Sequence, residues 1–511
     1  MSHEGVLPGM SEVSGQKSAS EPRSEAAEPK PRFEFINRAQ LVFRSIDVEQ
    51  LIAIDHPARA IWEFLGRVDL GGFSAAVQAY EGERGRAAYD PRLLISLWVY
   101  SYSRGISAGR EIARLCEHDP AYQWLTGMKV VNYHSLTDFR VQHEVALKQL
   151  FIQILAVLSQ EGLVSLERVM NDGTKIKAQA SKQSLRGKQK IKEHLKLARQ
   201  QVAALEGEAA AELSERRAKA QQRAARENEA RLQAALAEFD KLQKQKPTRE
   251  EQELRVSKSE PEARKMKQAD GGYTLSYNVQ LSTEQSHGII VGVGLGQSAA
   301  DCNELTKAVE RVKENTGQLP AQVVADGGYL TGPNIKQLQT QGIDFITPVT
   351  DSRDQLKPRG IAPQYGREAF SYEAVNNCYQ CPAGQLLSFQ GVEQRGGRER
   401  HRYQAKAAVC AACVCKPQCC PKTSRGRSLT RLEYDAEVAA HKARMQTATA
   451  KEIYKQRGQT AEFPIAWIKE KLGLRRFHVR GLLKAELEML WAASTHNIQQ
   501  WMRLCWTPQF R

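Results

Sequence analysis

The sequence predicts a mixed α/β protein in which helical regions flank a central region of strands and helices. Three observations lead to this prediction. Apolar residues recur at helical spacing from about residue 40 to residue 162. Short apolar, β-branched runs bounded by turn residues alternate with helical patterns over 163–350. Helical periodicity returns over 433–511, so we expect the α/β region to be completed by a helical C-terminal part.

Length and charge limit the classes of protein that fit. A chain of 511 residues is too long for one ordinary core, so we expect several domains. Lys and Arg outnumber Asp and Glu by 73 to 58, which favours a polyanionic partner such as nucleic acid. A basic protein without a nucleic-acid role would show the same balance. No apolar run approaches the ~18 residues that cross a bilayer, and no secretory signal is recognisable. We therefore expect a cytoplasmic protein without a membrane partner.

The first residues differ sharply in composition from the region that follows. Residues 1–39 are rich in Ser, Glu, Pro and Gly, which is typical of a disordered tail. Within 40–162, apolar residues three and four apart in Pro57–Leu65 predict the first of several short helices. Ser107 and Ser135 are candidate helix caps. We expect an all-helical domain that acts either as a helix-turn-helix DNA reader or as a scaffold or dimerisation domain.

A long charged segment interrupts the α/β region soon after it begins. Residues 166–170 form a strand candidate that ends at Asp172. The segment 182–265 that follows is largely built from Ala, Glu, Lys, Gln, Arg and Leu, and it lacks Gly and Pro between Gly207 and Pro247. This composition predicts a long helix or a helical hairpin. It is either a solvated spacer or an arm that contacts DNA or a partner.

The elements after this insert alternate between strands and helices. They are an antiparallel strand pair at 272–281 and 288–295, a helix at about 299–315, a strand at 321–326, a helix at 333–341 and a strand at 343–349. The order is therefore β, long insert, β, β, α, β, α, β. This is the order of a ribonuclease-H-like domain, which has three meandering strands followed by alternating helices and strands.

Two Asp-Gly pairs mark candidate active-site positions. Asp172 and Asp326 each follow an apolar run, which places their carboxylates at the carboxyl edge of the sheet. Taken singly, an Asp-Gly after a strand is an ordinary turn signal. On neighbouring central strands, the two carboxylates could bridge a metal pair. Two Mg²⁺ ions about 3.5–4 Å apart stabilise the attacking and leaving oxygens of a phosphodiester displacement.

A third acid is expected from a C-terminal helix, and Glu462 is the candidate. Glu462 and Lys469 are seven residues apart, so both can face one side of a helix. Pro464 predicts that this helix begins near the acid. The acid would meet the metal while Lys469 or Arg457 contacts a DNA phosphate. Read alone, the segment is a basic amphipathic helix, and Glu470 is the next acid to consider.

The segment that contains Glu462 resembles a known signature. It is similar to the Tyr-x2-Arg-x3-Glu-x6-Lys motif of DDE transposases from bacterial insertion sequences, with matches at Tyr454-x2-Arg457 and Glu462-x6-Lys469. Four residues rather than three separate Arg457 from Glu462. Other segments resemble the same family, and the similarity covers nearly the whole chain beyond residue 40. They are Tyr89-Asp-Pro-Arg-Leu-Leu, Asp172-Gly-Thr-Lys-Ile-Lys, Tyr277-Asn-Val-Gln, Asp326-Gly-Gly-Tyr and Phe477-His-Val-Arg-Gly-Leu482.

This resemblance implies a transposase that uses two Mg²⁺ or Mn²⁺ ions held by Asp172, Asp326 and Glu462. Water would first hydrolyse a phosphodiester at an element end, and the freed 3′-hydroxyl would then attack target DNA. No covalent protein–DNA intermediate is needed.

The resemblance also implies the partners. These are the terminal inverted repeats of the element and the target DNA, bound by a homo-oligomer at the nucleoid. The residues expected to contact DNA are Tyr454, Arg457 and Lys469. Two alternatives stay open at this point. One is a catalytically inactive, DNA-binding remnant of a transposable element, and the other is a ribonuclease-H-like nuclease without strand transfer.

A cysteine-rich insert is predicted at 363–431, between the second and third acids. Seven of the ten cysteines lie from Cys378 to Cys420. The candidate ligands of a structural Zn²⁺ are Cys378, Cys381, Cys410 and Cys413, whose spacing is typical of a zinc ribbon. Further cysteines that could replace or extend this set are Cys415, Cys419 and Cys420. A reduced, metal-free cluster is the alternative, because structural disulfides are not expected in a reducing compartment.

Overall fold

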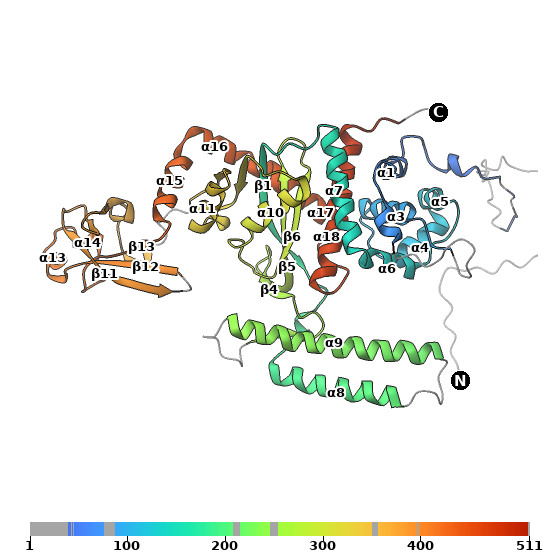
Figure 1. The fold of residues 1–511 in the computed structure, drawn as a ribbon, viewed down its shortest axis with the longest axis horizontal. Coiled ribbons are helices and arrows are strands. Elements are labelled where there is room, and N and C mark those ends of the chain that lie inside the picture. Colours follow the sequence, from blue (N-terminus) through green and yellow to red (C-terminus); the bar gives the residue numbers. More distant parts are fainter. Residues whose placement is uncertain are drawn as a thin grey trace, which may run out of the picture. The chain divides into compact units, whose positions relative to one another are not determined.

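The computed structural model describes residues 39–41, 43, 45–75, 87–207, 215–245, 254–349, 356–395 and 398–508. One compact unit, Asp47–Arg511, contains the described helices and strands. It is a mixed α/β protein whose N-terminal region is helical, as predicted (Figure 1). Apart from Ala39, the tail predicted over 1–39 lies outside the described residues.

The N-terminal region is built from short helices around a core of aromatic and aliphatic side chains. Its helices are α1 (Pro57–Leu65), α2 (Gly71–Ser74), α3 (Pro91–Ser103), α4 (Gly109–His118), α5 (Pro120–Thr126), α6 (Tyr133–Gln142) and α7 (Glu144–Gln160). Within the described residues, no single helix is long and apolar enough to cross a membrane. The pair α6 and α7 meets that test only when the two are taken together across a bend of 76°.

The two serines expected to cap helices in this region do not do so. Helix α4 begins after Ala108 and has no side-chain cap. Ser135 lies inside α6, because the side chain of Asn132 accepts the N–H of His134 at 2.8 Å and caps that helix earlier. Both cap predictions were therefore wrong. For α6 the physical reason is that Asn caps a helix as well as Ser does, and it comes first along the chain.

A mixed sheet forms the centre of the protein. Its strands are β1 (Arg168–Lys177), β4 (Arg264–Lys267), β5 (Tyr273–Glu284), β6 (Ile290–Gly296), β7 (Gln322–Ala325) and β8 (Asp344–Ile346). They are ordered β4-β5-β1-β7-β8, and β6 also pairs with β5. Strands β1, β5 and β6 are antiparallel neighbours, whereas β7 and β8 run parallel to β1. The predicted order of strands and helices is confirmed except for β4, an edge strand that was not predicted.

Helices cover both faces of this sheet. Helices α10 (Leu305–Thr316) and α11 (Gly332–Thr340) pack with Val323 and Ala325 of β7. The opposite face of β7, with Val324, packs with α16 (Ala448–Lys455) and α17 (Arg457–Glu470). Helix α10 begins at Leu305, later than the predicted start near 299, so the residues before it form a loop.

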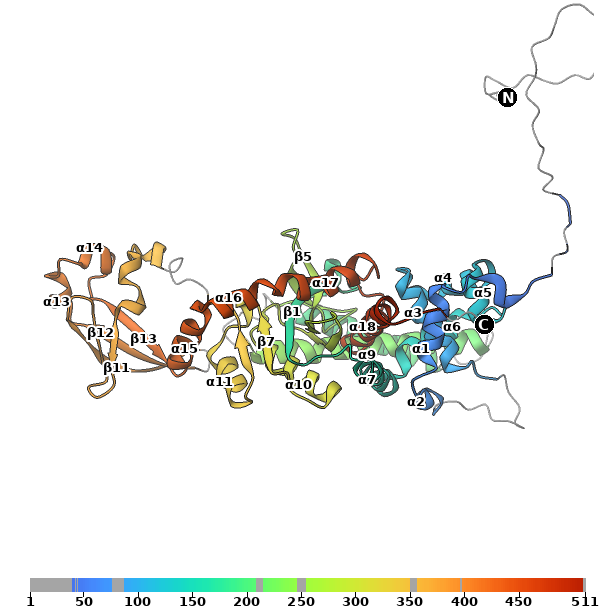
Figure 2. The same cartoon turned by 90° about the horizontal axis from the view of Figure 1, so that it is seen from above.

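The last helix joins the sheet to the N-terminal helices. Helix α18 (Leu482–Leu504) contacts β6 as well as α3 and α7. Helix α17 packs on β1 and β5 (Figure 2). The C-terminal segment therefore completes the core that the central strands begin.

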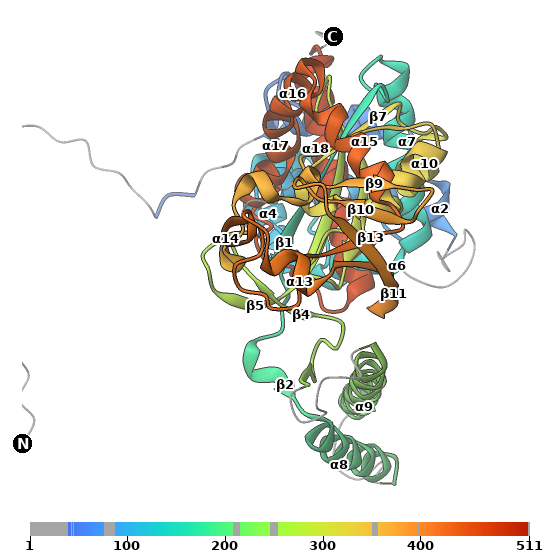
Figure 3. The same ribbon diagram turned by 90° about the vertical axis from the view of Figure 1, so that its left-hand side faces the viewer.

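The charged insert is a helical hairpin of α8 (Lys188–Gly207) and α9 (Glu215–Gln245), which lie side by side (Figure 3). Apolar residues from both helices form its seam, among them Ile191, Leu195, Leu232 and Phe239. The two-residue strands β2 (Leu185–Arg186) and β3 (Val256–Ser257) pair at its base. Of the two predicted alternatives, one long helix or a helical hairpin, the structure has the hairpin.

The cysteine-rich segment contains a sheet that the sequence did not predict. Its five antiparallel strands are β9 (Ser371–Glu373), β10 (Cys378–Gln380), β11 (Leu386–Arg395), β12 (Arg398–Ala405) and β13 (Ser428–Leu432). The small hydrophobic core of this sheet includes Phe370, Leu387 of β11 and Tyr403 of β12. The strands were missed because β12 is dominated by charged and polar residues, with few apolar positions to set a period of two.

A buried charge pair links α6 to α18, and we predict that the fold depends on it. Glu488 is fully buried, and its carboxylate lies 3.6 Å from the guanidinium of Arg140. Glu488→Gln should lower the free energy of unfolding by about 3–5 kcal/mol, because it leaves Arg140 buried without its counter-charge. Denaturant unfolding measures this loss. Lys484→Ala, on the exposed side of α18, is the control; equal losses in both variants would contradict the prediction.

Candidate active site

The pairing of β1 with β7 brings the two aspartates together. Asn171 of β1 is the parallel partner of Ala325, the last residue of β7. The next residue of each segment is an aspartate, so Asp172 and Asp326 lie beside each other. Both follow Met170 and Val324 by two residues, and these two side chains pack towards α16 and α17. The alternation of side chains along a strand therefore directs both carboxylates to that face.

Only one of the two aspartates terminates its strand. Asp326 follows β7 and caps the short 3-10 helix Gly327–Tyr329, where its side chain accepts the N–H of Gly328 at 2.8 Å. Asp172 lies within β1, which continues to Lys177. The prediction that Asp172 ends a strand was wrong because β5 pairs with β1 beyond this point. Such pairing with a distant segment cannot be read from the local run of residues.

Glu462 is an exposed residue of α17, the helix that covers the face of the two aspartates. The helix begins at Arg457, so the predicted start near Pro464 was wrong. Pro464 is buried inside the helix, where its ring packs in the core although it lacks the N–H of a regular helical residue. Burial raises the pKa of Asp172, and the charge of Arg457 opposes that rise. The carboxylates of Asp326 and Glu462 also raise the pKa of Asp172.

The three residues expected at DNA all lie around these acids. Arg457 forms an ion pair with Asp172 at 2.9 Å, and both side chains are largely buried. The pKa of the Tyr454 hydroxyl is raised by burial, and the neighbouring charge of Arg457 opposes this rise. Lys469 donates a hydrogen bond from Nζ to the hydroxyl of Thr174, which is two residues beyond Asp172 on β1. Burial lowers the pKa of Lys469.

Glu470, the alternative third acid, does not join this group. Its carboxylate forms an ion pair with Arg475. The arrangement in α17 therefore favours Glu462.

The three acids offer carboxylate oxygens as ligands for a metal ion. Carboxylate oxygens are the donors that Mg²⁺ takes from proteins, so the donor set suits it. In the described parts of the chain, no three His, Cys, Asp or Glu side chains are arranged to hold a metal ion. The guanidinium of Arg457 supplies the positive charge next to Asp172.

The sequence did not indicate the polar residues on the other face of β1. They are Asn171, Lys175, Asn278, Gln280, Asp301 and Tyr329, which are joined by hydrogen bonds. One signal was available in the sequence. Asn278 and Gln280 are polar residues two apart in an otherwise apolar strand, so both lie on one face of it.

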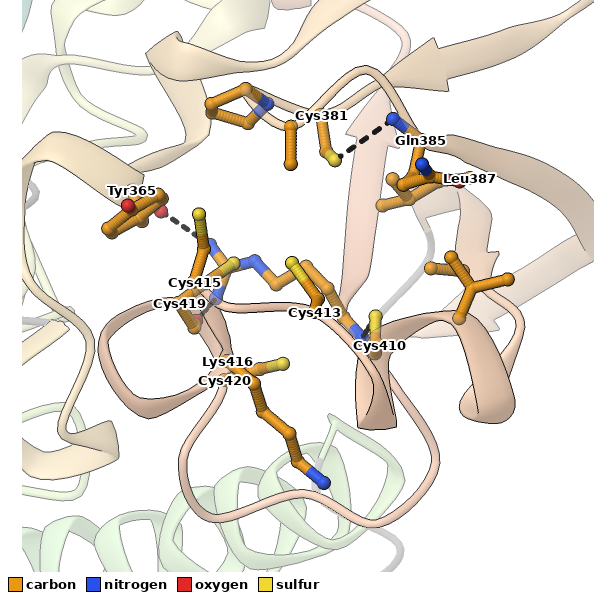
Figure 4. A pocket seen from close by; sticks show the side chains of 15 residues that line it. Tyr365, Cys381, Gln385, Leu387, Cys410, Cys413, Cys415, Lys416, Cys419 and Cys420 are labelled. Atoms are coloured by element: carbon orange, nitrogen blue, oxygen red, sulfur yellow. Dashed lines mark hydrogen bonds between the residues drawn. The ribbon is translucent and has the colours of Figure 1, made fainter.

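The cysteines gather around one cavity (Figure 4). It is lined by Cys381, Cys410, Cys413, Cys415, Cys419 and Cys420. Cys381 accepts the N–H of Gln385 at 3.3 Å, and Cys410 accepts the N–H of Arg427 at 3.4 Å. Burial raises the pKa of Cys419 to about 12. All ten cysteines are free thiols.

Cys378, one of the four expected zinc ligands, does not line this cavity. It lies in β10, and its thiol donates to the carboxylate of Glu373 at 3.4 Å. The pairing of β10 with β9 places these two residues opposite each other. The structure therefore brings Cys381, Cys410 and Cys413 together without Cys378.

Two protein families match the chain. The family described as "Transposase DDE domain" matches residues 380–502, which include Glu462 but neither aspartate. The family described as "Transposase domain (DUF772)" matches residues 46–142, which hold helices α1 to α6. Searches of curated proteins and of solved structures found no match. The two matched families occur here in one chain, and they support its similarity to the DDE transposases of insertion sequences that carry an N-terminal transposase domain.

Proposed function

We propose that this protein is the DNA transposase of a bacterial insertion sequence. It hydrolyses a phosphodiester at each element end and then joins the freed 3′-hydroxyl to target DNA. The observation that carries the proposal is the parallel register of β1 and β7, which sets Asp172 beside Asp326 on the face covered by α17. Glu462, inside the matched DDE domain, completes the acidic set from that helix.

We further propose a ribonuclease-H-like catalytic domain. The order β6-β5-β1-β7-β8, with the first three strands antiparallel and the last two parallel to β1, supports it. Its first part would be 163–350, interrupted by the helical insert 182–265. Its last part would be 433–511, separated from the first by the cysteine-rich insert 363–431. The helical domain 40–162 precedes it.

Asp172, Asp326 and Glu462 would hold two Mg²⁺ or Mn²⁺ ions. Such ions activate water and neutralise the charge that develops on the attacking and leaving oxygens of the phosphodiester. Before the metal ions bind, the guanidinium of Arg457 balances the negative charge of Asp172. Its Nε is buried and has no hydrogen-bond partner among the described residues, so a reorientation of this guanidinium would free a donor for a DNA phosphate.

The same proposal places the protein on DNA. Lys469 and Tyr454 lie beside the acids and would contact the backbone next to the scissile phosphate. We propose a homo-oligomer that holds the inverted repeats and target DNA together at the nucleoid in the cytoplasm. The inactive remnant and the plain nuclease are not favoured, because all three acids are present and the N-terminal transposase domain accompanies them.

The acids give the first test of this function. Asp172→Asn, Asp326→Asn and Glu462→Gln should each lower cleavage of element-end DNA roughly a hundredfold or more, since each removes a charge that acts on the reacting phosphate. DNA affinity should persist, because a lost carboxylate removes repulsion. Glu470→Gln, in the same helix, is the matched control and should cleave normally. Full activity of Glu462→Gln would contradict the assignment.

Lys469 gives a second test, by DNA affinity at several salt concentrations. If Lys469 neutralises one phosphate, Lys469→Ala should weaken binding equally for all sequences and reduce the slope of log affinity against log salt by about 1. Lys313→Ala is the control, because Lys313 is exposed on α10, which covers the other face of the sheet. A loss confined to particular sequences would indicate base reading and refute the phosphate contact.

A structural Zn²⁺ in the cysteine cavity is a separate proposal, supported by the thiols that line it (Figure 4). Side-chain rotation would have to bring the thiols together. Elemental analysis of reduced, chelator-free protein should find about one zinc per chain. Cys410→Ser with Cys413→Ser should lose it, and Cys378→Ser should retain it because Cys378 pairs with Glu373. Protein without zinc would refute the proposal.

A further inference from the structure

A buried polar network lies behind the acids, on the face of β1 opposite α17. The hydroxyl of Tyr329 donates to the amide oxygen of Gln280. The amide nitrogen of Gln280 donates to Oδ1 of Asp301 at 2.8 Å, and Asn278 donates to the same oxygen at 2.6 Å. Lys175 forms an ion pair with Asp301 at 3.2 Å. The network thus connects β1, β5, the loop before α10 and the segment after β7.

One end of the network is the loop that begins with Asp326. Asp326 caps the short helix Gly327–Tyr329, so Tyr329 is the last residue of the turn that the acid begins. Beyond Ala325 the loop is no longer part of the sheet. The hydroxyl of Thr347 donates to the Asp326 carbonyl at 2.7 Å, and the fully buried Tyr329 ties the other end of the turn to β5 through Gln280.

The other end of the network contacts β1, the strand that contains Asp172. Gln280 is the strand partner of Gly173, the residue next to Asp172. A Cβ on Gly173 would lie 2.6 Å from Nε2 of Gln280, 2.7 Å from Oδ1 of Asp301 and 3.1 Å from the hydroxyl of Tyr329. The first two distances are shorter than ordinary Cβ contacts, so a side chain at this position would displace the ends of Gln280 and Asp301. The network therefore lies against Gly173, next to Asp172, and includes Tyr329, which ends the turn that begins at Asp326.

We propose that Tyr329 is a positioning residue, which acts through Gln280 and Asp301 to fix the distance between Asp172 and Asp326 and so the affinity of the acids for metal. The proposal rests on the function proposed above. Two neighbouring carboxylates repel each other, and a loop outside the sheet can yield to that repulsion unless it is anchored. Burial and the nearby carboxylates raise the pKa of Tyr329, so its hydroxyl remains a donor at neutral pH.

The experiment measures Mn²⁺ binding to the full chain by electron paramagnetic resonance of the free ion, with no DNA and no turnover. Tyr329→Phe should bind Mn²⁺ roughly tenfold more weakly, in the range found when a partner behind a metal ligand is removed. The fold should survive, because the amide oxygen of Gln280 keeps Asn171 as a donor at 3.3 Å.

Tyr277→Phe is the matched control. Tyr277 is also a fully buried tyrosine of the same domain, and its hydroxyl donates to Glu260 at 3.0 Å, outside the network. Tyr277→Phe should lower the free energy of unfolding about as much as Tyr329→Phe does, and it should leave the Mn²⁺ affinity unchanged. Gly173→Ala, which displaces the network from β1, should weaken Mn²⁺ binding as Tyr329→Phe does. Wild-type affinity in both of these variants, or an equal loss in Tyr277→Phe, would overturn the proposal.

Asp172→Asn separates this inference from the function on which it rests. This variant should lose Mn²⁺ binding at the site. If it binds Mn²⁺ like the wild type, the metal site itself is wrong and the proposed function fails. If it loses Mn²⁺ while Tyr329→Phe and Gly173→Ala do not, only the role of Tyr329 fails.

Discussion

The backbone hydrogen bonds between β1 and β7 hold Asp172 next to Asp326. Two unit charges 4 Å apart repel each other by about 4 kcal/mol at an effective dielectric constant of 20, so adjacent carboxylates need both a rigid scaffold and a compensating charge. The sheet supplies the first and the ion pair of Arg457 with Asp172 the second. The guanidinium of Arg457 lies next to Asp172, where the proposed function requires metal cations. DNA phosphates would compete with Asp172 for this guanidinium.

The acids and the polar network lie on opposite faces of the central sheet. Helices α16 and α17 cover the face that carries the acids, and the network of Tyr329, Gln280 and Asp301 lies on the other. The cysteine-rich sheet separates Glu462 from Asp326 along the chain without disturbing this arrangement. Arg444 of α15 (Asp435–Gln446) forms a 2.9 Å ion pair with Asp344 of β8, so the chain returns to the central sheet after the insert. An insertion between ends held so close is tolerated because loop closure costs little more as a loop lengthens.

The order of strands and helices and the position of Asp326 could be predicted from the sequence, because each depends on a local run of residues with a clear period. The insert was predicted as helical, but the choice between one long helix and a hairpin stayed open. Several of the features that were missed depend on distant segments. Asp172 lies inside β1 because β5 pairs with it, and the partner of Arg457 is fixed only when α17 packs on the sheet. Tyr329 follows Asp326 in an ordinary turn sequence, and its contact with Gln280 exists only in the folded chain.

The central claim is that the three acids form one metal site. Anomalous diffraction at the manganese edge, from crystals of the protein with Mn²⁺ and element-end DNA, tests it most directly. We expect two manganese peaks between Asp172, Asp326 and Glu462, with Arg457 turned from Asp172 to a DNA phosphate. A complex in which the Arg457–Asp172 pair is intact and manganese is bound elsewhere would contradict it.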